Sequence, residues 1–314
     1  MENSLVKKKT LGYWVKRDIQ RNWALYLLLV PVLAYFIVFE YAPMYGVTLA
    51  FKNYKVKLGI MDSPWSDPVF KNFQRFFKSY NFKMLITNTL GISLYQIAVG
   101  FPMPIVLALL LNYLRSKRLK KTIQMVSYAP HFISTVVICS MLTLFTASGT
   151  GIFNILLRPF GWEDVNMLAK PEWFKSIYVW SGVWQGVGWD AIIYLSALAG
   201  VDHEMHEAAI LDGATKLQRI IHIDLPTIVP TIVMLFILRM GSVMSVGFEK
   251  VFLLQNSLNY NASATISTYV YEVGLLDHDY SFSTAAGLFN NVINIILLVG
   301  ANWFSKRAFK ESLW

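Results

Sequence analysis

The stretch VDHEMHEAAILDGATKLQRIIHIDLP, from Val201 to Pro226, is polar and lies between two long apolar runs. Within it, the letters EAA are followed after three residues by Gly213 and, nine residues later, by the pattern I-x-L-P. The apolar runs on either side are each about 20 residues long, the length that an α-helix needs to cross the hydrocarbon of a bilayer. The stretch therefore predicts a short polar connection between two membrane spans.

Local signals within this connection predict two short helices. The Asp202 carboxylate is expected to accept hydrogen bonds from the free backbone amides at the start of a helix that runs through Leu211. Gly213 is expected to take the left-handed conformation that ends this helix. Thr215, followed by Gln218, has the spacing of a capping box for a second helix through about Ile221. Pro226 is expected to interrupt the helical hydrogen bonds before the next span.

The composition of the whole chain is that of a membrane protein. Hydrophobic residues make up 55% of the 314 residues and charged residues 15%, whereas a soluble domain carries about 25% charged residues. We therefore expect an all-α, polytopic integral membrane protein, because helices satisfy their own backbone hydrogen bonds where water is absent. The expected six transmembrane helices lie at about 23–46, 84–112, 122–147, 175–199, 228–248 and 285–304.

Basic residues set the expected orientation. Of the 28 Lys and Arg residues, 16 lie at the face that carries the N-terminal segment, the EAA loop and the C-terminus, against 11 at the opposite face. Lys and Arg are retained in the cytoplasm, so both termini are predicted to be cytoplasmic. The net charge of +9 follows from this membrane topology, and no nucleic-acid partner is expected. The expected regions are an amphipathic segment on the membrane lipid at 1–22, a six-helix transmembrane domain at 23–304 with its polar EAA loop at about 201–226, and a cytoplasmic tail at 305–314.

The sequence offers no catalytic constellation. No Gly is followed by Lys, so a phosphate-binding P-loop cannot be written anywhere. The single cysteine, Cys139, lies in an apolar run and is expected to be buried. His203 and His206 share a helical face and could be metal ligands, but a tetrahedral site needs more, so a solvated or docking face is the preferred interpretation. We expect no catalytic residue, no metal and no cofactor in this chain.

Ionisable and aromatic residues within the spans are candidates for a solute path. Arg239 and Asp190 lie inside the fifth and fourth spans, where a charge is costly and is by default functional. They could form a structural ion pair, contact the solute or contact a partner subunit. Aromatic rings can stack on sugar rings, although packing at the membrane interface explains each single one as well. The full set of path candidates is Trp184, Trp189, Asp190, Tyr194, Arg239 and Glu249, the last at the expected end of the fifth span.

The EAA pattern resembles the cytoplasmic loop by which permease subunits of binding-protein-dependent ABC importers hold their ATPase. The matching positions, and hence the implied coupling residues, are Glu207, Ala208, Ala209, Gly213, Ile223, Leu225 and Pro226. The segments 41–54, 188–202 and 248–274 are similar to the polysaccharide and oligosaccharide branch of the carbohydrate importers. In that branch Pro often follows the Asp of the loop and Tyr often precedes EAA, whereas this chain has His203 and His206. Because of these two differences, the position of this chain within that branch stays open.

The resemblance implies a type I importer permease in the bacterial inner membrane. It implies a second, related permease, two ABC ATPase subunits that hold ATP and Mg²⁺, an extracytoplasmic solute-binding protein and an oligosaccharide substrate. The chain itself would not be an enzyme. The alternative is a self-sufficient secondary transporter or channel in which Asp190 and Arg239 carry ion coupling, but no inverted repeat or pair of broken spans supports it.

Overall fold

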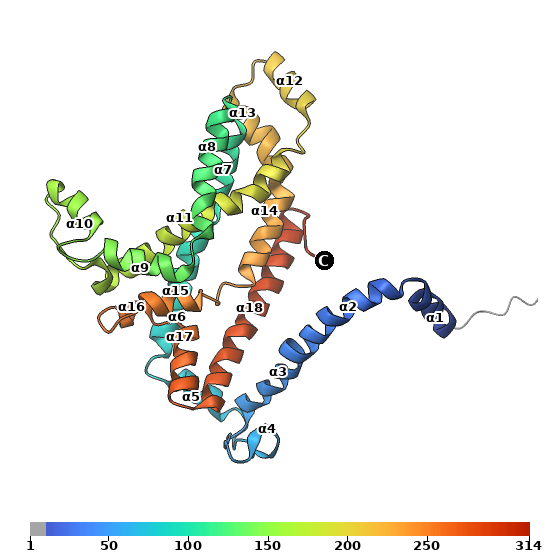
Figure 1. The fold of residues 1–314 in the computed structure, drawn as a ribbon, viewed down its shortest axis with the longest axis vertical. Helices are drawn as coiled ribbons and strands as arrows, with labels where there is room; N and C mark the ends of the chain where they lie inside the picture. Colours follow the sequence, from blue (N-terminus) through green and yellow to red (C-terminus); the bar gives the residue numbers. More distant parts are fainter. Residues whose placement is uncertain (1–10) are drawn as a thin grey trace, which may run out of the picture.

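The computed structural model describes residues 11–314, and this part of the chain is built from helices. It contains no β-strand among these residues, only two isolated bridges, Lys52 with Trp65 and Lys55 with Gly59. The helices form an elongated bundle from which one long N-terminal arm diverges (Figure 1). The expected all-α fold is confirmed.

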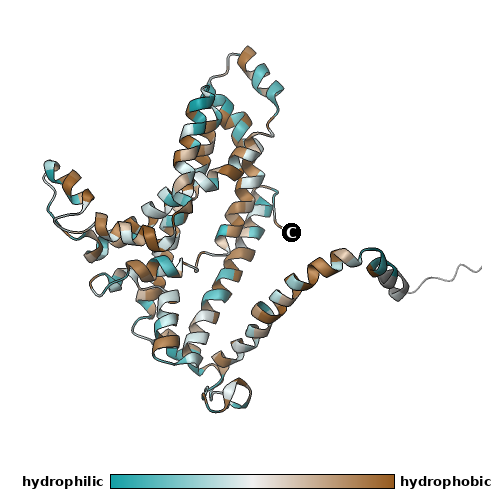
Figure 2. Cartoon of the chain, in the orientation of Figure 1, coloured by the Kyte–Doolittle hydropathy of each residue, from teal (hydrophilic) through white to brown (hydrophobic). Residues whose placement is uncertain are grey.

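Several helices have the length and apolarity of membrane spans. Within residues 11–314 four qualify, and a bent pair adds a fifth. A further helix, α11 (Pro171–Leu198), is 28 residues long but is not apolar enough to be counted, so the count of six spans stays a prediction. Figure 2 shows apolar residues along most of the bundle and hydrophilic ones toward one tip and the start of the arm. The four single spans are Trp23–Phe51, Phe82–Asn112, Lys216–Met240 and Tyr280–Ala308.

Helix α11 lies at the centre of the bundle. It packs against α6 (Phe82–Tyr95), α7 (Pro102–Asn112), α8 (Lys117–Tyr128) and α14 (Leu225–Met240), while α14 also packs against α18 (Tyr280–Ala308). Phe174 and Val179 of α11 are fully buried in one core cluster. Tyr194 and Leu198, nearer its end, belong to a second cluster. Because α11 contacts several spans, its position determines the spaces between them.

The expected third span, 122–147, is not a single rod. It consists of helical segment Lys117–Phe132 and α9 (Thr135–Phe145), which meet at 98°. Ile133 and Ser134 between them are extended, and the Ser134 hydroxyl accepts the Val137 amide to start α9. The Gln185 side chain of α11 donates to the carbonyl of Ile133 at 3.1 Å. The bend is tolerated because side chains satisfy the backbone groups that it frees. Cys139 in α9 is buried, as expected.

The expected fifth span, 228–248, was misplaced at both ends. Pro226 does not interrupt the helix: α13 (Lys216–Arg219), a π-helical segment (Ile220–Asp224) and α14 run on continuously, with Pro226 in the first turn of α14. At the other end the helix stops at Met240, where side chains from two neighbouring helices bind the backbone that follows. The Asn294 side chain accepts the Met244 amide at 2.8 Å, and the Ser93 hydroxyl donates to the Val243 carbonyl. Glu249 therefore lies in the first turn of a separate helix, α15 (Phe248–Leu254), rather than at the end of the span.

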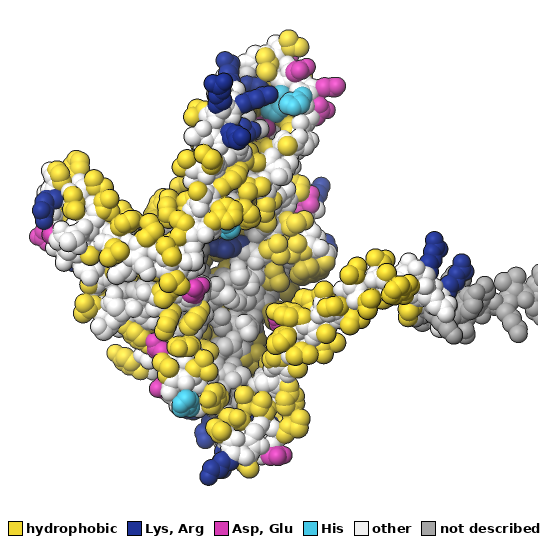
Figure 3. All heavy atoms as spheres, in the orientation of Figure 1, with side chains coloured by type: hydrophobic (Ala, Val, Ile, Leu, Met, Phe, Trp, Pro, Cys, Tyr) yellow, Lys and Arg dark blue, Asp and Glu magenta, His cyan; other side chains and the backbone are white. Residues whose placement is uncertain are grey.

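The N-terminal arm comprises α1 (Leu11–Arg21) and a long helical segment that begins with α2 (Trp23–Tyr35) and includes α3 (Ala42–Met44). No residue of α2 is buried, and the arm projects away from the bundle (Figures 1 and 3). The expected amphipathic segment 1–22 falls partly on residues 1–10, which lie outside the described residues. The short helices that complete the fold are α4 (Gly59–Asp62), α5 (Lys71–Lys78), α10 (Ile152–Leu157), α12 (His203–Leu211), α16 (Tyr260–Ser263) and α17 (Ile266–Tyr271).

Candidate functional site

The EAA segment forms the tip of the bundle, where α12 and α13 lie (Figure 1). The Asp202 carboxylate accepts the amide of Glu204 at 2.9 Å and caps α12. Gly213 has φ of +77°, the left-handed region. Thr215 and Gln218 form a reciprocal capping box at the start of α13. These three local predictions are confirmed, and they show that the two short helices are specified by their own end signals.

The tip exposes large apolar side chains that the sequence interpretation did not single out. Leu211 is 89% exposed, and Met205, Ile210 and Leu217 are each at least half exposed. Glu207 and Ala208 are exposed beside them, and Glu207 has no hydrogen bond or ion pair with any residue from 11 to 314. Figure 3 shows this end as a mixture of apolar, acidic, basic and histidine side chains. An exposed cluster of apolar side chains rimmed by charge is typical of a surface that another protein covers.

The other residues of the EAA pattern fasten the tip to the bundle. Ile223 is buried in a core cluster with Ala108 and Leu198, and Ala209 packs against the same cluster. Leu225 is partly buried, whereas Pro226 is exposed. The pattern thus combines an exposed part on α12 with a buried anchor at the start of α14.

The two histidines of α12 do not meet in a metal site. His203 is exposed, and His206 contacts Asp224 with its Nε2 atom 3.2 Å from a carboxylate oxygen. Residues 11–314 contain no group of three or more His, Cys, Asp or Glu side chains placed to hold a metal ion.

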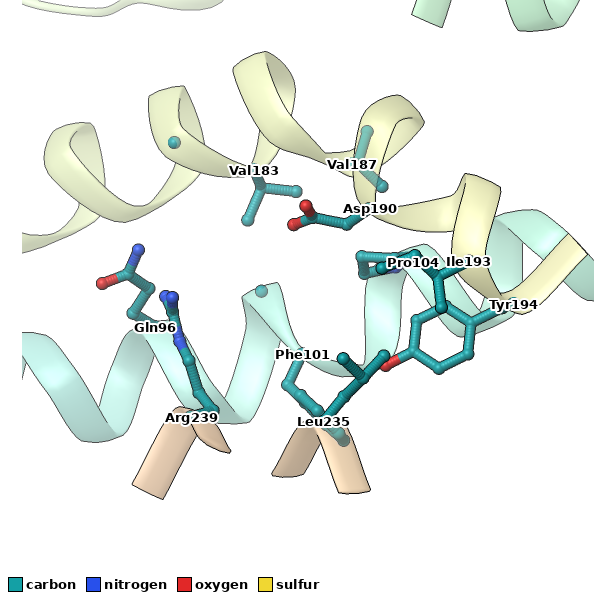
Figure 4. A pocket seen from close by; sticks show the side chains of 12 residues that line it. Gln96, Phe101, Pro104, Val183, Val187, Asp190, Ile193, Tyr194, Leu235 and Arg239 are labelled. Carbon is teal, nitrogen blue, oxygen red and sulfur yellow. The ribbon is translucent and has the colours of Figure 1, made fainter. Parts of the chain in front are cut away.

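A cavity of 180 Å³ lies deeper in the bundle, between α7, α11 and α14 (Figure 4). Asp190 and Tyr194 of α11 and Arg239 of α14 line it, so three of the six path candidates come together here. Figure 4 shows the carboxylate of Asp190 and the guanidinium of Arg239 directed into this space from opposite helices. The remaining wall is largely apolar and includes Phe101 and Leu235.

A second cavity of 220 Å³ shares Gln96 and Arg239 with the first. Its wall is polar, with the hydroxyl groups of Ser93, Ser242 and Ser245 among its lining residues. The sequence interpretation missed Gln96 and these serines. Ser93 and Gln96, three residues apart within an apolar run, were the signal that could have pointed to them.

Asp190 and Arg239 do not form an ion pair. Neither side chain makes a hydrogen bond or salt bridge with another residue in the described part of the chain, although both line the same cavity. The structural ion pair considered from the sequence is therefore absent in this conformation. Two opposite charges facing a cavity are available to hydroxyl and carboxylate groups of a solute.

The other three path candidates lie outside these cavities. Trp189 stacks on His131 with ring centroids 4.3 Å apart. Trp184 faces an apolar groove of 720 Å³ between α9, α10 and α11. Glu249 is exposed at the start of α15. In this conformation, therefore, the two tryptophans and Glu249 do not meet Asp190, Tyr194 and Arg239.

A sequence comparison assigns the chain to a family. The family described as "Binding-protein-dependent transport system inner membrane component" matches residues 100–310, which include the tip and every residue that lines the first cavity except Gln96. The chain belongs to this family. This transport component is similar to Protein LplB of Bacillus subtilis, at 43% identity over 96% of this chain and 92% of the relative. It is also 41% identical to the polygalacturonan/rhamnogalacturonan transport system permease protein YteP of the same organism, over 99% and 96% of the two chains.

A solved structure resembles this permease over nearly its whole length. A chain of a bacterial alginate ABC transporter, crystallised in complex with an alginate pentasaccharide-bound periplasmic protein, superposes with a TM-score of 0.86. The two chains are 39% identical, and the match covers 95% of this chain and 99% of the other. The expected fold, that of a type I ABC importer permease, is confirmed, and its place is the inner membrane.

Proposed function

We propose that this chain forms one half of a path through which an ATP-driven importer takes up oligosaccharides or polysaccharide fragments. The observation that carries the proposal is the cavity between membrane-spanning helices where Asp190, Tyr194 and Arg239 meet. Relatives are named for polygalacturonan, rhamnogalacturonan and arabinooligosaccharide transport, and a structural neighbour for alginate. Polar groups in the cavity would bind sugar hydroxyls, and the Arg239 guanidinium would donate hydrogen bonds to the carboxylate of an acidic sugar.

The tip supports a proposal about the energy source. The exposed apolar side chains around Leu211, together with Glu207, which has no partner among residues 11–314, form a surface suited to a cleft in an ATPase subunit, which would hold ATP and Mg²⁺. Two such ATPases, a second related permease and an extracytoplasmic binding protein would complete the importer. In this arrangement the tip and both termini face the cytoplasm, in agreement with the bias of basic residues.

The proposed mechanism is alternating access driven from the tip. When ATP closes the ATPase dimer, the two EAA tips would be drawn together and the spans would open outward. The binding protein would then release saccharide to the cavity of each permease, where transient hydrogen bonds guide it. Hydrolysis of ATP or release of the nucleotide would let the ATPase dimer open, and the spans would return to the inward-open arrangement. Weak binding is an advantage here, because a path must also release its solute.

Uptake by reconstituted vesicles tests the proposal. The tagged chain is purified from its native membrane in mild detergent with whatever remains bound, and its partners are identified by mass spectrometry. The complex is reconstituted, and uptake of a labelled oligogalacturonide in the presence of its binding protein is measured with ATP inside or with an imposed proton or sodium gradient. We expect an ATPase and a second permease to co-purify and uptake to need ATP. Uptake by a homo-oligomer driven by the ion gradient alone would instead establish secondary transport.

A further inference from the structure

Asp224 is a fully buried carboxylate at the base of the tip. It ends the π-helical segment that joins α13 to α14, and its exposed fraction is 0%. A carboxylate at such a position is destabilising unless hydrogen bonds and charges compensate it. The neighbouring positions, Ile223 and Ile228, are buried apolar residues. An apolar side chain would therefore fill the position of Asp224 at lower cost, which points to a role other than packing.

Two side chains from different elements bind the two oxygens of Asp224. The Tyr113 hydroxyl, at the end of α7, donates to one oxygen at 2.6 Å. The His206 Nε2 atom of α12 lies 3.2 Å from the other, and an imidazole that carries its proton on Nε2 donates there. Burial, followed by the hydrogen bond and the charge of Asp224, raises the pKa of Tyr113 well above its ordinary value, so this phenol remains a donor.

Arg219 adds a positive charge next to Tyr113. The Arg219 guanidinium lies over the Tyr113 ring, 5.5 Å from its centroid, and its Nε atom is buried without a hydrogen-bond partner among the described residues. The arginine brings positive charge close to the buried carboxylate. Tyr113 and His206 bind Asp224 directly, and Arg219 packs on the Tyr113 ring. These four residues, which we call the Asp224 cluster, thus connect the end of α7 and α12 to the start of α14, with α13 attached through Arg219.

Two of the helices that the cluster joins, α7 and α14, also line the cavity. Pro104 of α7 and Leu235 and Arg239 of α14 line it, and α12 carries the exposed face of the tip. A hydrogen-bonded group with defined geometry transmits a displacement better than apolar packing, because its partners cannot slide past one another without breaking bonds.

We propose that Asp224 is a positioning residue that transmits movement of the tip to the solute path. Its hydrogen bonds to Tyr113 and His206 hold α12 in a fixed orientation relative to α7 and α14, so that force applied to α12 displaces both helices together. This inference rests on the proposed function, because it takes α12 as the surface on which an ATPase acts.

The test measures uptake and ATP hydrolysis in the same vesicles, using the whole complex. Tyr113→Phe removes one hydroxyl and preserves the ring, and Asp224→Asn preserves the shape but removes the charge. In both variants we expect the ATPase to stay bound and to hydrolyse ATP, while the number of saccharides transported per ATP falls about tenfold, the effect of losing a hydrogen bond to a charged acceptor. His206→Ala should have the same effect, and His206→Gln, which retains a donor, should restore most of the ratio.

Tyr80→Phe is the matched control, because Tyr80 is 100% exposed and its hydroxyl binds no described residue. An unchanged ratio in Tyr113→Phe and Asp224→Asn overturns the inference, and so does a parallel loss of uptake and hydrolysis, which indicates a purely structural role. Other outcomes would count against the proposed importer function itself. In that case the unmutated complex shows no ATP-dependent uptake, or Glu207→Lys leaves the ratio of uptake to hydrolysis unchanged.

Discussion

The tip and the cavity depart from the usual distribution of side chains in opposite ways. At the tip, apolar residues such as Leu211 face outward, while the carboxylate of Asp224 is buried beneath them. In the cavity, the charged side chains of Asp190 and Arg239 face an opening inside an apolar bundle. Each arrangement is unfavourable in the isolated chain, and each becomes favourable when something else binds: a protein at the tip and a polar solute in the cavity.

The two regions also differ in how they are built. The ends of the two short helices at the tip are set by residues within a few positions of one another, whereas the cavity brings together α7, α11 and α14 from distant parts of the sequence. Changes that disturb helix packing should therefore affect the cavity most, and changes on α12 should affect energy coupling most. The following predictions test this division, from the largest expected effect to the smallest.

Gly188→Ala should have the largest effect, on folding itself. A Cβ atom at position 188 would lie 2.2 Å from the carbonyl oxygen of Ser127 in α8, so α11 would have to move away from α8. We expect a loss of roughly 3 kcal/mol in the free energy of unfolding, as for a severe case of overpacking, measured by thermal denaturation in detergent. Gly287→Ala is the control, because nothing lies within 4 Å of its Cβ position. Equal stability of the two variants would show that α11 and α8 are not in close contact.

Glu207→Lys should abolish coupling without harming the fold. Glu207 is exposed and has no partner among residues 11–314, so reversing its charge costs the isolated chain little. Against a partner that pairs with the carboxylate, we expect ATP-driven uptake to fall at least ~30-fold while insertion and thermal stability are retained. Glu163→Lys, at an exposed site away from the tip, serves as the control. Normal uptake by the Glu207 variant would contradict the coupling role of the tip.

Arg239→Gln should change the choice of substrate. If Arg239 binds a carboxylate in the cavity, the KM for an acidic oligosaccharide should rise about tenfold, while that for a neutral oligosaccharide stays the same. Both are measured as initial rates of uptake in vesicles. A lower thermal stability with an unchanged preference would instead assign Arg239 to the structure of the bundle.

Gly213→Ala should have the smallest effect. The φ of +77° at this position costs an L-residue about 1 kcal/mol, although no atom lies near the added Cβ. We expect a small decrease in thermal stability and a modest decrease in coupled uptake. Gly213→Asn should lower thermal stability and uptake less than Gly213→Ala does, because Asn tolerates this conformation. A loss as large as that of Glu207→Lys would show that the turn itself contacts the partner.

The tip was the most predictable part of the molecule. Asp202, Gly213 and the pair Thr215 and Gln218 act through hydrogen bonds and dihedral angles within a few residues, and these preferences can be recognised in the sequence. The all-α fold followed equally from apolar runs of spanning length. Pro226 was misjudged because a π-helical segment, in which the Leu225 amide donates to the Ile220 carbonyl, comes directly before it and accommodates the amide that proline lacks.

The bends and the cavity could not be predicted, because they depend on distant side chains. The break near Ile133 is accompanied by a hydrogen bond from Gln185, and the early end of α14 by hydrogen bonds from Ser93 and Asn294. For the same reason Asp190, Tyr194 and Arg239 were identified as single candidates, while their joint cavity and the contribution of Gln96 emerged only from the packing of α7, α11 and α14.

Site-directed crosslinking from the tip shows whether an ATPase subunit covers it in the membrane. Leu211→Cys is made in a Cys139→Ala background, so that the new thiol, at a position 89% exposed, is the only one in the chain. Native membranes are treated with a short bifunctional reagent, and crosslinked products are identified by mass spectrometry, with Tyr80→Cys as the control at an exposed site away from the tip. We expect a crosslink from position 211 to an ABC ATPase, absent from position 80 and altered in yield by ATP. A thiol at position 211 that reacts freely with a soluble label but never crosslinks to an ATPase would contradict this expectation.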